Sequence, residues 1–301
     1  MSEPHVVMVP YQFSRQTMYP LLDNVIDRDL NPKASHIKFD FNQLAFIEPT
    51  GITILSNLFE WLMKRGTRVT LSYPAQATGR NHPITFLDDS GFFKRYLGQK
   101  INPLACVRDT TMPLEKVTYD RSFQWLNNDF VTWLTNTLDM TTESIIDFKI
   151  CLEELFNNIK DHAKEDTGCI FSQYYPRNNE VKISISDFGV GIPHNVKSQH
   201  PTFSDSEALL NAIQEGFSTQ STPRNRGVGL HTLVKNVVEH NQGCVYIHSN
   251  NGILSCMNVN NVPTFIDQVS SSFYPGTLIE IVLKVDNIEY IPIEEEETYT
   301  W

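Results

Sequence analysis

The stretch Ile150–Ala163, Ile-Cys-Leu-Glu-Glu-Leu-Phe-Asn-Asn-Ile-Lys-Asp-His-Ala, lies in a helical pattern that begins near Thr142. Its apolar residues recur at steps of three and four and so form one stripe: Ile145, Phe148, Leu152, Leu155, Phe156 and Ile159. A second stripe has Glu154, Asn158 and His162, each four residues apart. A carboxylate, an amide and an imidazole bordering a buried face indicate a functional site. The alternative interpretation is a partly exposed helix with ordinary polar residues.

Length and composition limit the classes of protein. The 301 residues are enough for two domains, and 41% apolar with 20% charged residues is ordinary for a soluble globular protein. A net charge of −11 argues against direct nucleic-acid binding, which needs clustered Lys and Arg. No apolar stretch of bilayer length and no leader pattern is present, so we expect a cytoplasmic protein without a membrane partner. Five scattered cysteines are typical of reduced thiols rather than of disulfides or a zinc site.

The first hundred residues alternate strand and helix patterns. His36–Phe41 alternates as a strand, and Pro49-Thr50-Gly51 then opens a predicted helix over 52–64. The apolar residues of this helix are spaced to pack inward: Ile54, Leu55, Leu58, Phe59 and Leu62. Gly66 is placed as its C-terminal stop, and Thr67–Tyr73 is another strand. This alternation predicts a small α/β domain.

The same stretch resembles a STAS domain, the fold of anti-sigma-factor antagonists. The resemblance rests on Phe39-Asp40-Phe41-Asn42 and Phe46-Ile47-Glu48-Pro49-Thr50-Gly51-Ile52, with the helix and strand that follow. It implies a phosphoacceptor serine at the position held here by Pro49. Proline has no hydroxyl, so we expect that the phosphoswitch is lost. Thr50 could accept phosphate instead, or it could be the N-cap of the helix.

The sequence predicts that the chain is divided into two domains, a linker and a tail. Residues 99–116 carry scattered Pro and Thr without a period, and we interpret them as a linker or an irregular crossover. An amphipathic helix over 123–138 follows, and the acidic run 294–297 is typical of a solvated tail. The predicted parts are a STAS-like domain, a linker, a second domain and an acidic tail: residues 1–98, 99–116, 117–287 and 288–301.

A strand over 181–186 runs into Asp187-Phe188-Gly189-Val190-Gly191-Ile192-Pro193. A strand that ends in Asp-x-Gly-x-Gly places one carboxylate beside backbone that can approach a flat ligand closely. A protein kinase is disfavoured because the chain has no His-Arg-Asp loop. A Rossmann fingerprint is disfavoured because Pro193 stands where a third glycine would open a helix, and no P-loop motif occurs.

A second glycine motif, Arg226-Gly227-Val228-Gly229-Leu230, precedes a helical pattern over 233–238. Glycines before a helix leave backbone N–H groups and the positive end of the dipole available to phosphates. The polar stretch from Gly216 through Ser218 and Thr219 to Arg226 suits a lid over phosphate; the alternative is a surface loop with glycine caps. Antiparallel strands are expected over 243–249, 253–257 and 277–283, the last opened by Gly276-Thr277.

In this order and spacing, the motifs resemble the GHKL ATPase domain over about 119–285. The resemblance implies an α/β sandwich with helices over one face of a mixed sheet. Within the superfamily the chain is most similar to anti-sigma-factor serine kinases, which carry Glu-x-x-x-Asn-x-x-x-His where this chain has Glu154, Asn158 and His162. Two departures are Ile159 after the asparagine, where alanine is common, and a long insertion over 258–275.

The resemblance also implies ATP and Mg²⁺ as cofactors and assigns roles to residues. Asn158 would hold Mg²⁺ against the phosphates, and Glu154 would be the general base. Asp187 would accept a hydrogen bond from the adenine amino group, with support from Thr277. Contacts to the nucleotide are implied for the remaining motif residues: His162, Gly189, Gly191, Ser218, Thr219, Arg226, Gly227, Gly229 and Leu230.

We therefore expect an ATP-binding regulatory protein of partner-switch type. It would be a Ser/Thr protein kinase or slow ATPase that acts on or through a protein partner. Two alternatives stay open: a non-catalytic switch gated by ATP, which Pro49 favours, and an ATP-driven dimer clamp, for which the chain would form a homodimer. A phosphorelay histidine kinase is disfavoured because the predicted helix over 123–138 contains no histidine.

Overall fold

The first sheet of the protein consists of parallel strands. A computed structural model describes residues 3–75, 79–162, 167–216 and 229–292 of the chain. Three strands pair in the order β1-β3-β5, and β2 and β4 form a separate parallel pair. The strands are β1 (His5–Met8), β2 (Gln12–Phe13), β3 (His36–Asp40), β4 (Phe46–Ile47) and β5 (Arg68–Ser72). The helices around them are α1 (Tyr19–Val25), α2 (Pro49–Lys64), α3 (Pro83–Asp89) and α4 (Phe92–Leu97).

The second sheet has five strands in the order β6-β7-β8-β10-β9, and every neighbouring pair is antiparallel. The strands are β6 (Thr111–Thr118), β7 (Thr167–Tyr175), β8 (Glu180–Asp187), β9 (Cys244–Val259) and β10 (Val262–Lys284). The turn between β9 and β10 has positive φ at both Asn260 and Asn261, as a two-residue hairpin turn requires. The expectation of a mixed sheet is therefore wrong.

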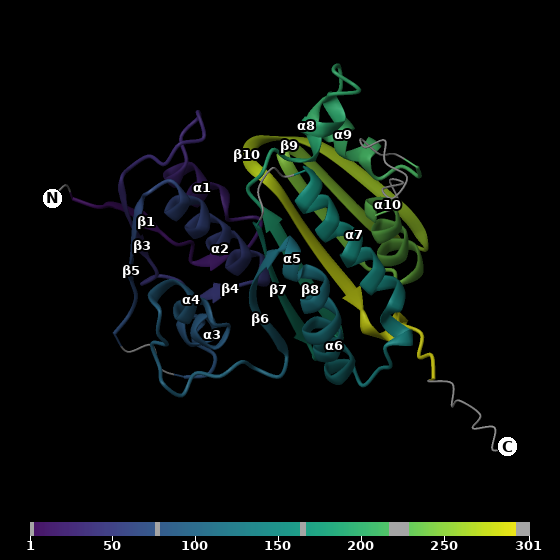
Figure 1. Cartoon of the computed structure of the whole chain (residues 1–301), viewed down its shortest axis with the longest axis horizontal. Coiled ribbons are helices and arrows are strands. Elements are labelled where there is room, and N and C mark those ends of the chain that lie inside the picture. Colours follow the sequence, from purple (N-terminus) through teal and green to yellow (C-terminus); the bar gives the residue numbers. More distant parts are fainter. Residues whose placement is uncertain (1–2, 76–78, 163–166, 217–228, 293–301) are drawn as a thin grey trace.

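Helices cover one face of this sheet, with α7 running across it (Figure 1). They are α5 (Tyr119–Trp125), η1 (Leu126–Phe130), α6 (Val131–Leu138), η2 (Glu143–Ile145), α7 (Ile146–His162), α8 (Ile192–Lys197), α9 (Asp205–Ala212), α10 (Gly229–Val234), η3 (Lys235–His240) and η4 (Val285–Asn287). The helical patterns predicted over 123–138 and from 142 coincide with η1–α6 and η2–α7. In the described part of the chain, no helix has both the length and the apolarity that crossing a bilayer needs.

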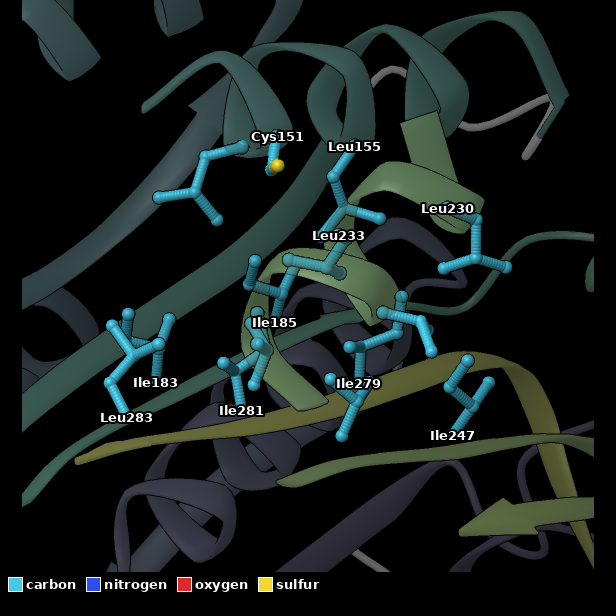
Figure 2. Close-up of a cluster of buried hydrophobic side chains, with 14 of the residues drawn as sticks. Cys151, Leu155, Ile183, Ile185, Leu230, Leu233, Ile247, Ile279, Ile281 and Leu283 are labelled. Atoms are coloured by element: carbon cyan, nitrogen blue, oxygen red, sulfur yellow. The ribbon is translucent and has the colours of Figure 1, made fainter. Parts of the chain in front are cut away.

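Successive strand residues point to opposite faces of the five-stranded sheet. We call the face under α7 the front face and the opposite one the rear face. Ile183 and Ile185 of β8 and Ile279 and Ile281 of β10 point to the front face and pack with Leu155 of α7 (Figure 2). Residues on the rear face, among them Phe171, Tyr274 and Leu278, belong to the same hydrophobic core as the N-terminal part of the chain. The sheet is thus shared by two cores.

Helix α2 covers the rear face, so it is buried on two sides. One stripe packs into the N-terminal core, where the Phe59 ring lies 4.7 Å from that of Phe39. The other stripe is polar and meets the five-stranded sheet. Thr50 Oγ1 donates to Glu280 Oε2 at 2.5 Å, and Ser56 Oγ lies 3.1 Å from Cys169 Sγ. The expectation that helices cover one face of the sheet holds only for the C-terminal helices.

Three further expectations need correction. Helix α2 begins at Pro49 rather than at 52, and its N-cap is Glu48, so Thr50 is inside the first turn and is not the cap. Residues 99–116, predicted as a linker or irregular crossover, include the first residues of β6, which pair with β7. Residues 258–275, predicted as an insertion, continue β9 and β10 as a hairpin, and the strand expected over 253–257 is part of β9.

We expect His248 to make the stability of the protein depend on pH. This rear-face side chain is fully buried, and burial lowers its pKa to about 4. The unfolded chain binds a proton near the ordinary pKa of about 6.5, so stability falls as the pH drops below that value and levels off near the folded pKa. Urea unfolding should show about 2 kcal/mol less stability at pH 5 than at pH 7 from this group.

His248→Gln should remove this part of the pH dependence, whereas His194→Gln, at an exposed position on α8, should retain it. An equal loss of stability between pH 7 and pH 5 in the wild type and His248→Gln would contradict the assignment.

Candidate functional site

A row of residues crosses the front face at one end of the five-stranded sheet. Asp187 of β8 is paired in register with Gly168 of β7 and with Thr277 of β10, which in turn is paired with Ser249 of β9. Asp187, Thr277 and Ser249 alternate in step with the front-face core residues of their strands, so their side chains point to the helix side. We call Asp187, Thr277 and Ser249 the front row. They are at most 8% exposed.

The chain after Asp187 folds back on this carboxylate. Gly189 N–H donates to Asp187 Oδ1 at 2.8 Å, so the Asp-x-Gly turn is closed on its own side chain. Gly276 packs against the turn from the side of β10, with φ +94°, and a Cβ there would lie 2.3 Å from the Asp187 carbonyl oxygen. Any side chain at Gly276 would therefore displace the backbone that carries Asp187.

Ser249 connects the turn to the sheet, and the sequence did not point to it. Its hydroxyl donates to Gly276 O at 2.7 Å, lies 3.0 Å from Thr277 Oγ1 and accepts from Ile192 N–H at 3.0 Å. Ser249 thereby fixes the start of α8 beside the front row. Asn250 Nδ2 adds a bond to Val190 O at 3.2 Å. A serine at the end of a predicted strand and the asparagine after it carry no motif, and only the strand pairing places them at the site.

Gly191 allows the same close approach on the other side of the turn. It has φ +81°, and a Cβ there would lie 2.7 Å from Ser249 Oγ and 2.8 Å from Asn250 Oδ1. The structure thus brings four predicted site residues into one cluster: Asp187, Gly189, Gly191 and Thr277.

Helix α7 carries Glu154 in the layer above the sheet. Its neighbours Leu152 and Leu155 are buried in the front core, which fixes the rotation of the helix. Glu154 itself is half-buried, and partial burial together with the like charge of Glu153 raises its pKa. A carboxylate with a raised pKa is a stronger base once it is ionised.

Of the second glycine motif, the structure describes only Gly229 and Leu230. Helix α10 begins at Gly229 and packs against α7, and Leu230 is 8% exposed in the front core (Figure 2). Four predicted contacts lie outside the described residues: Ser218, Thr219, Arg226 and Gly227. Asn158 and His162 belong to the last turns of α7, but their side chains lie outside the described part of the structure.

The cluster combines one carboxylate, two hydroxyls and backbone brought close by glycines. This set can accept a hydrogen bond from an amino group on a flat ring and can bind further ring atoms through hydroxyls or water. Among the described residues, no three or more His, Cys, Asp or Glu side chains are grouped to hold a metal ion. The cluster is thus chemically suited to recognising a ring rather than to holding a metal through acidic side chains.

The chain is similar to several solved structures and matches one family model. No curated protein sequence matches this one. The topoisomerase IV ATP-binding domain of Francisella tularensis, solved in complex with a small-molecule inhibitor, is 14% identical, with a TM-score of 0.27. The similarity covers 62% of this chain and 46% of that one, and at this TM-score it carries no argument.

The family model that matches is described as histidine kinase-, DNA gyrase B- and HSP90-like ATPase. It covers residues 143–286, a little under half of the chain, and includes α7, the Asp187 turn, α10 and Thr277. The match therefore supports an ATPase domain of this type at residues 143–286.

Proposed function

We propose that the protein binds ATP with Mg²⁺ and regulates a protein partner, as a Ser/Thr protein kinase or a slow ATPase of partner-switch type. The observation that carries the proposal is the front row, in which Asp187 and Thr277 are in register at the sheet end and the Asp187 turn is closed by Gly189. The match of residues 143–286 to an ATPase family model supports the same reading.

The front row fits the adenine end of a nucleotide. The Asp187 carboxylate would accept a hydrogen bond from the exocyclic amino group, which adenine has at the position where guanine has a carbonyl. Thr277 and Ser249 would support the ring through hydroxyls or water. Gly191 and Gly276 let the backbone pack closely around the Asp187 turn, where a Cβ would clash with neighbouring protein atoms. These features favour adenine over guanine.

The phosphate end of the site would lie along α7 toward α10. Asn158 supplies an amide oxygen, a ligand type that Mg²⁺ accepts, and Gly227 and Gly229 would present backbone N–H groups to phosphate. Bound Mg²⁺ would neutralise phosphate charge during transfer. Glu154 would take the proton from the attacking hydroxyl or water. His162, Ser218, Thr219 and Arg226 would add contacts to phosphate.

The N-terminal part is proposed to be a STAS-like regulatory unit. Its parallel β1-β3-β5 sheet and the turn at Glu48–Gly51 that opens α2 support this reading. In the structure, Thr50 is fully buried and hydrogen-bonded to Glu280, so a phosphoryl donor cannot reach its hydroxyl in this arrangement. The acceptor would therefore be a Ser or Thr on a separate protein.

A non-catalytic switch is the second candidate. It is favoured by the absence of an accessible acceptor at 49–50, where Pro49 has no hydroxyl and Thr50 is buried. In that case bound ATP would order the loop before α10 and so control a protein interface. Turnover distinguishes the two candidates, because the switch binds ATP without any release or transfer of phosphate.

Asp187→Asn should weaken the binding of Mg·ATP by about tenfold to a hundredfold, because a charged acceptor is replaced by a neutral amide. Calorimetric titration measures this directly. Glu180→Gln, at the other end of β8, is the matched control and should bind like the wild type. Equal affinities for wild type and Asp187→Asn would contradict the assignment of Asp187 to adenine.

Glu154→Gln should lower phosphate release or transfer by about a hundredfold or more while leaving ATP affinity nearly unchanged, because only the base is removed. Labelled ATP, with and without candidate protein substrates, provides the measurement. Turnover at the wild-type rate in this variant would exclude Glu154 as the base, and a wild type that binds ATP but never turns over would favour the non-catalytic switch.

Glu153→Gln should move the acid limb of the pH–rate profile to lower pH. The like charge of Glu153 raises the pKa of Glu154, so its removal lets Glu154 stay ionised to lower pH. The rate at high pH should be unchanged. An acid limb that stays in place would show that ionisation of Glu154 does not control the rate.

A further inference from the structure

Five aromatic rings cross the rear face of the sheet directly behind the front row. They come from both parts of the chain, and we call them the rear aromatic chain: Tyr19 of α1, His248 of β9, Tyr274 of β10, Phe188 after β8 and Trp61 of α2. Their ring centroids are separated in this order by 5.6, 5.7, 5.6 and 6.4 Å. Each step is within the range of a favourable aromatic contact, so the rings form one continuous contact path.

Two of the rings in the middle of the path are direct sequence neighbours of front-row residues. Phe188 follows Asp187, and His248 precedes Ser249. Because successive residues of an extended strand point to opposite faces, a rear ring and a front-row side chain share one piece of backbone. A backbone rotation that moves the ring therefore also moves its front-row neighbour.

Tyr274 holds the centre of the path. It is fully buried, and its hydroxyl lies 2.5 Å from Ser186 Oγ, on the residue before Asp187. Its ring touches Phe188, on the residue after Asp187. Tyr274 therefore contacts both sequence neighbours of the carboxylate from behind.

The N-terminal part supplies both ends of the path. The Tyr19 hydroxyl lies 3.0 Å from His248 Nδ1, and Trp61 is only 5% exposed, with its ring edge toward Phe188. The ring of Trp61 also lies under the guanidinium of Arg65, 4.2 Å from the ring centroid. The turn that carries Asp187 is thus enclosed by β10 on one side and by α2 behind.

We infer that Trp61 and Tyr19 are positioning residues for the nucleotide site, so that docking of the N-terminal part on the rear face sets the affinity for adenine nucleotide. The inference rests on the proposed function. The physical reason is that Phe188 and its partners on the path pack against the rear side of the turn that carries Asp187. Coupling of this kind is reciprocal, so bound nucleotide strengthens the docking of α2 by the same factor.

The test compares two aromatic substitutions at the same interface. Trp61→Leu removes the end of the path and should weaken ADP binding by about tenfold, which corresponds to about 1.4 kcal/mol. Phe86→Leu is the matched control, because Phe86 of α3 packs on Phe171 of β7 at 6.0 Å, away from the Asp187 turn. It should lose comparable stability in urea unfolding, yet bind ADP within about twofold of the wild type.

Two conservative variants separate positioning from general packing. Trp61→Phe keeps a ring at this position and should restore most of the affinity lost in Trp61→Leu. Tyr19→Phe removes only the tyrosine hydroxyl that contacts His248 and should weaken ADP binding by about twofold to threefold. If Trp61→Leu and Phe86→Leu lost ADP affinity in the same proportion to their loss of stability, the inference would be overturned.

Hydrogen exchange on the wild-type protein gives an independent readout if Trp61→Leu fails to fold. ADP should slow amide exchange in the part of α2 around Trp61 as well as at the Asp187 turn. Slowing at the turn alone would overturn the inference and leave the proposed function intact. Failure of the wild type to bind adenine nucleotide at all would instead overturn the proposed function.

Discussion

The structure depends on the burial of helix α2 between two sheets. Its apolar stripe completes the core of the β1-β3-β5 sheet, while Thr50, Thr53 and Ser56 lie on the rear face of the five-stranded sheet. A helix buried on two sides must satisfy its buried polar side chains within the protein. The bond from Thr50 to Glu280 and the contact of Ser56 with Cys169 do this, and they fix the register of the helix on the strands. The N-terminal part is therefore a second layer of the ATPase-type sheet and shares its core.

This arrangement gives the end of β8 two environments. Asp187 points to the helices of the ATPase-type domain, and Phe188 points to Trp61 of α2. The residue proposed to read adenine and the residue that contacts the N-terminal part are thus consecutive. Coupling between the two parts therefore needs no long path, since the peptide unit between Asp187 and Phe188 connects the proposed adenine contact to the contact with α2. A protein that displaced α2 from the rear face would act on the site through this unit.

Much of the front face was predictable because its signals are local. The apolar stripe of 145–159 predicts α7, and the strand that ends in Asp187-x-Gly-x-Gly predicts a carboxylate beside close-packed backbone. Glycine is required wherever the backbone has a positive φ or has no room for a Cβ, and this requirement holds in any fold. Gly191 and Gly276 have both properties. Ser249 and the rear aromatic chain were not predictable, because they act through strand pairing between segments far apart in the sequence.

Periodicity and glycine placement, which depend only on neighbouring residues, were enough to determine the helix carrying Glu154 and the turn after Asp187. The packing of α2 behind the five-stranded sheet and the role of Thr50 were decided by tertiary structure. A polar stripe on a helix is typical of a solvated face, and nothing local distinguishes it from one that will meet a second sheet. Hydrogen-bond partners such as Glu280 lie more than two hundred residues away. Their contribution exists only once both sheets have formed, so the burial of α2 could be learned only from the folded protein.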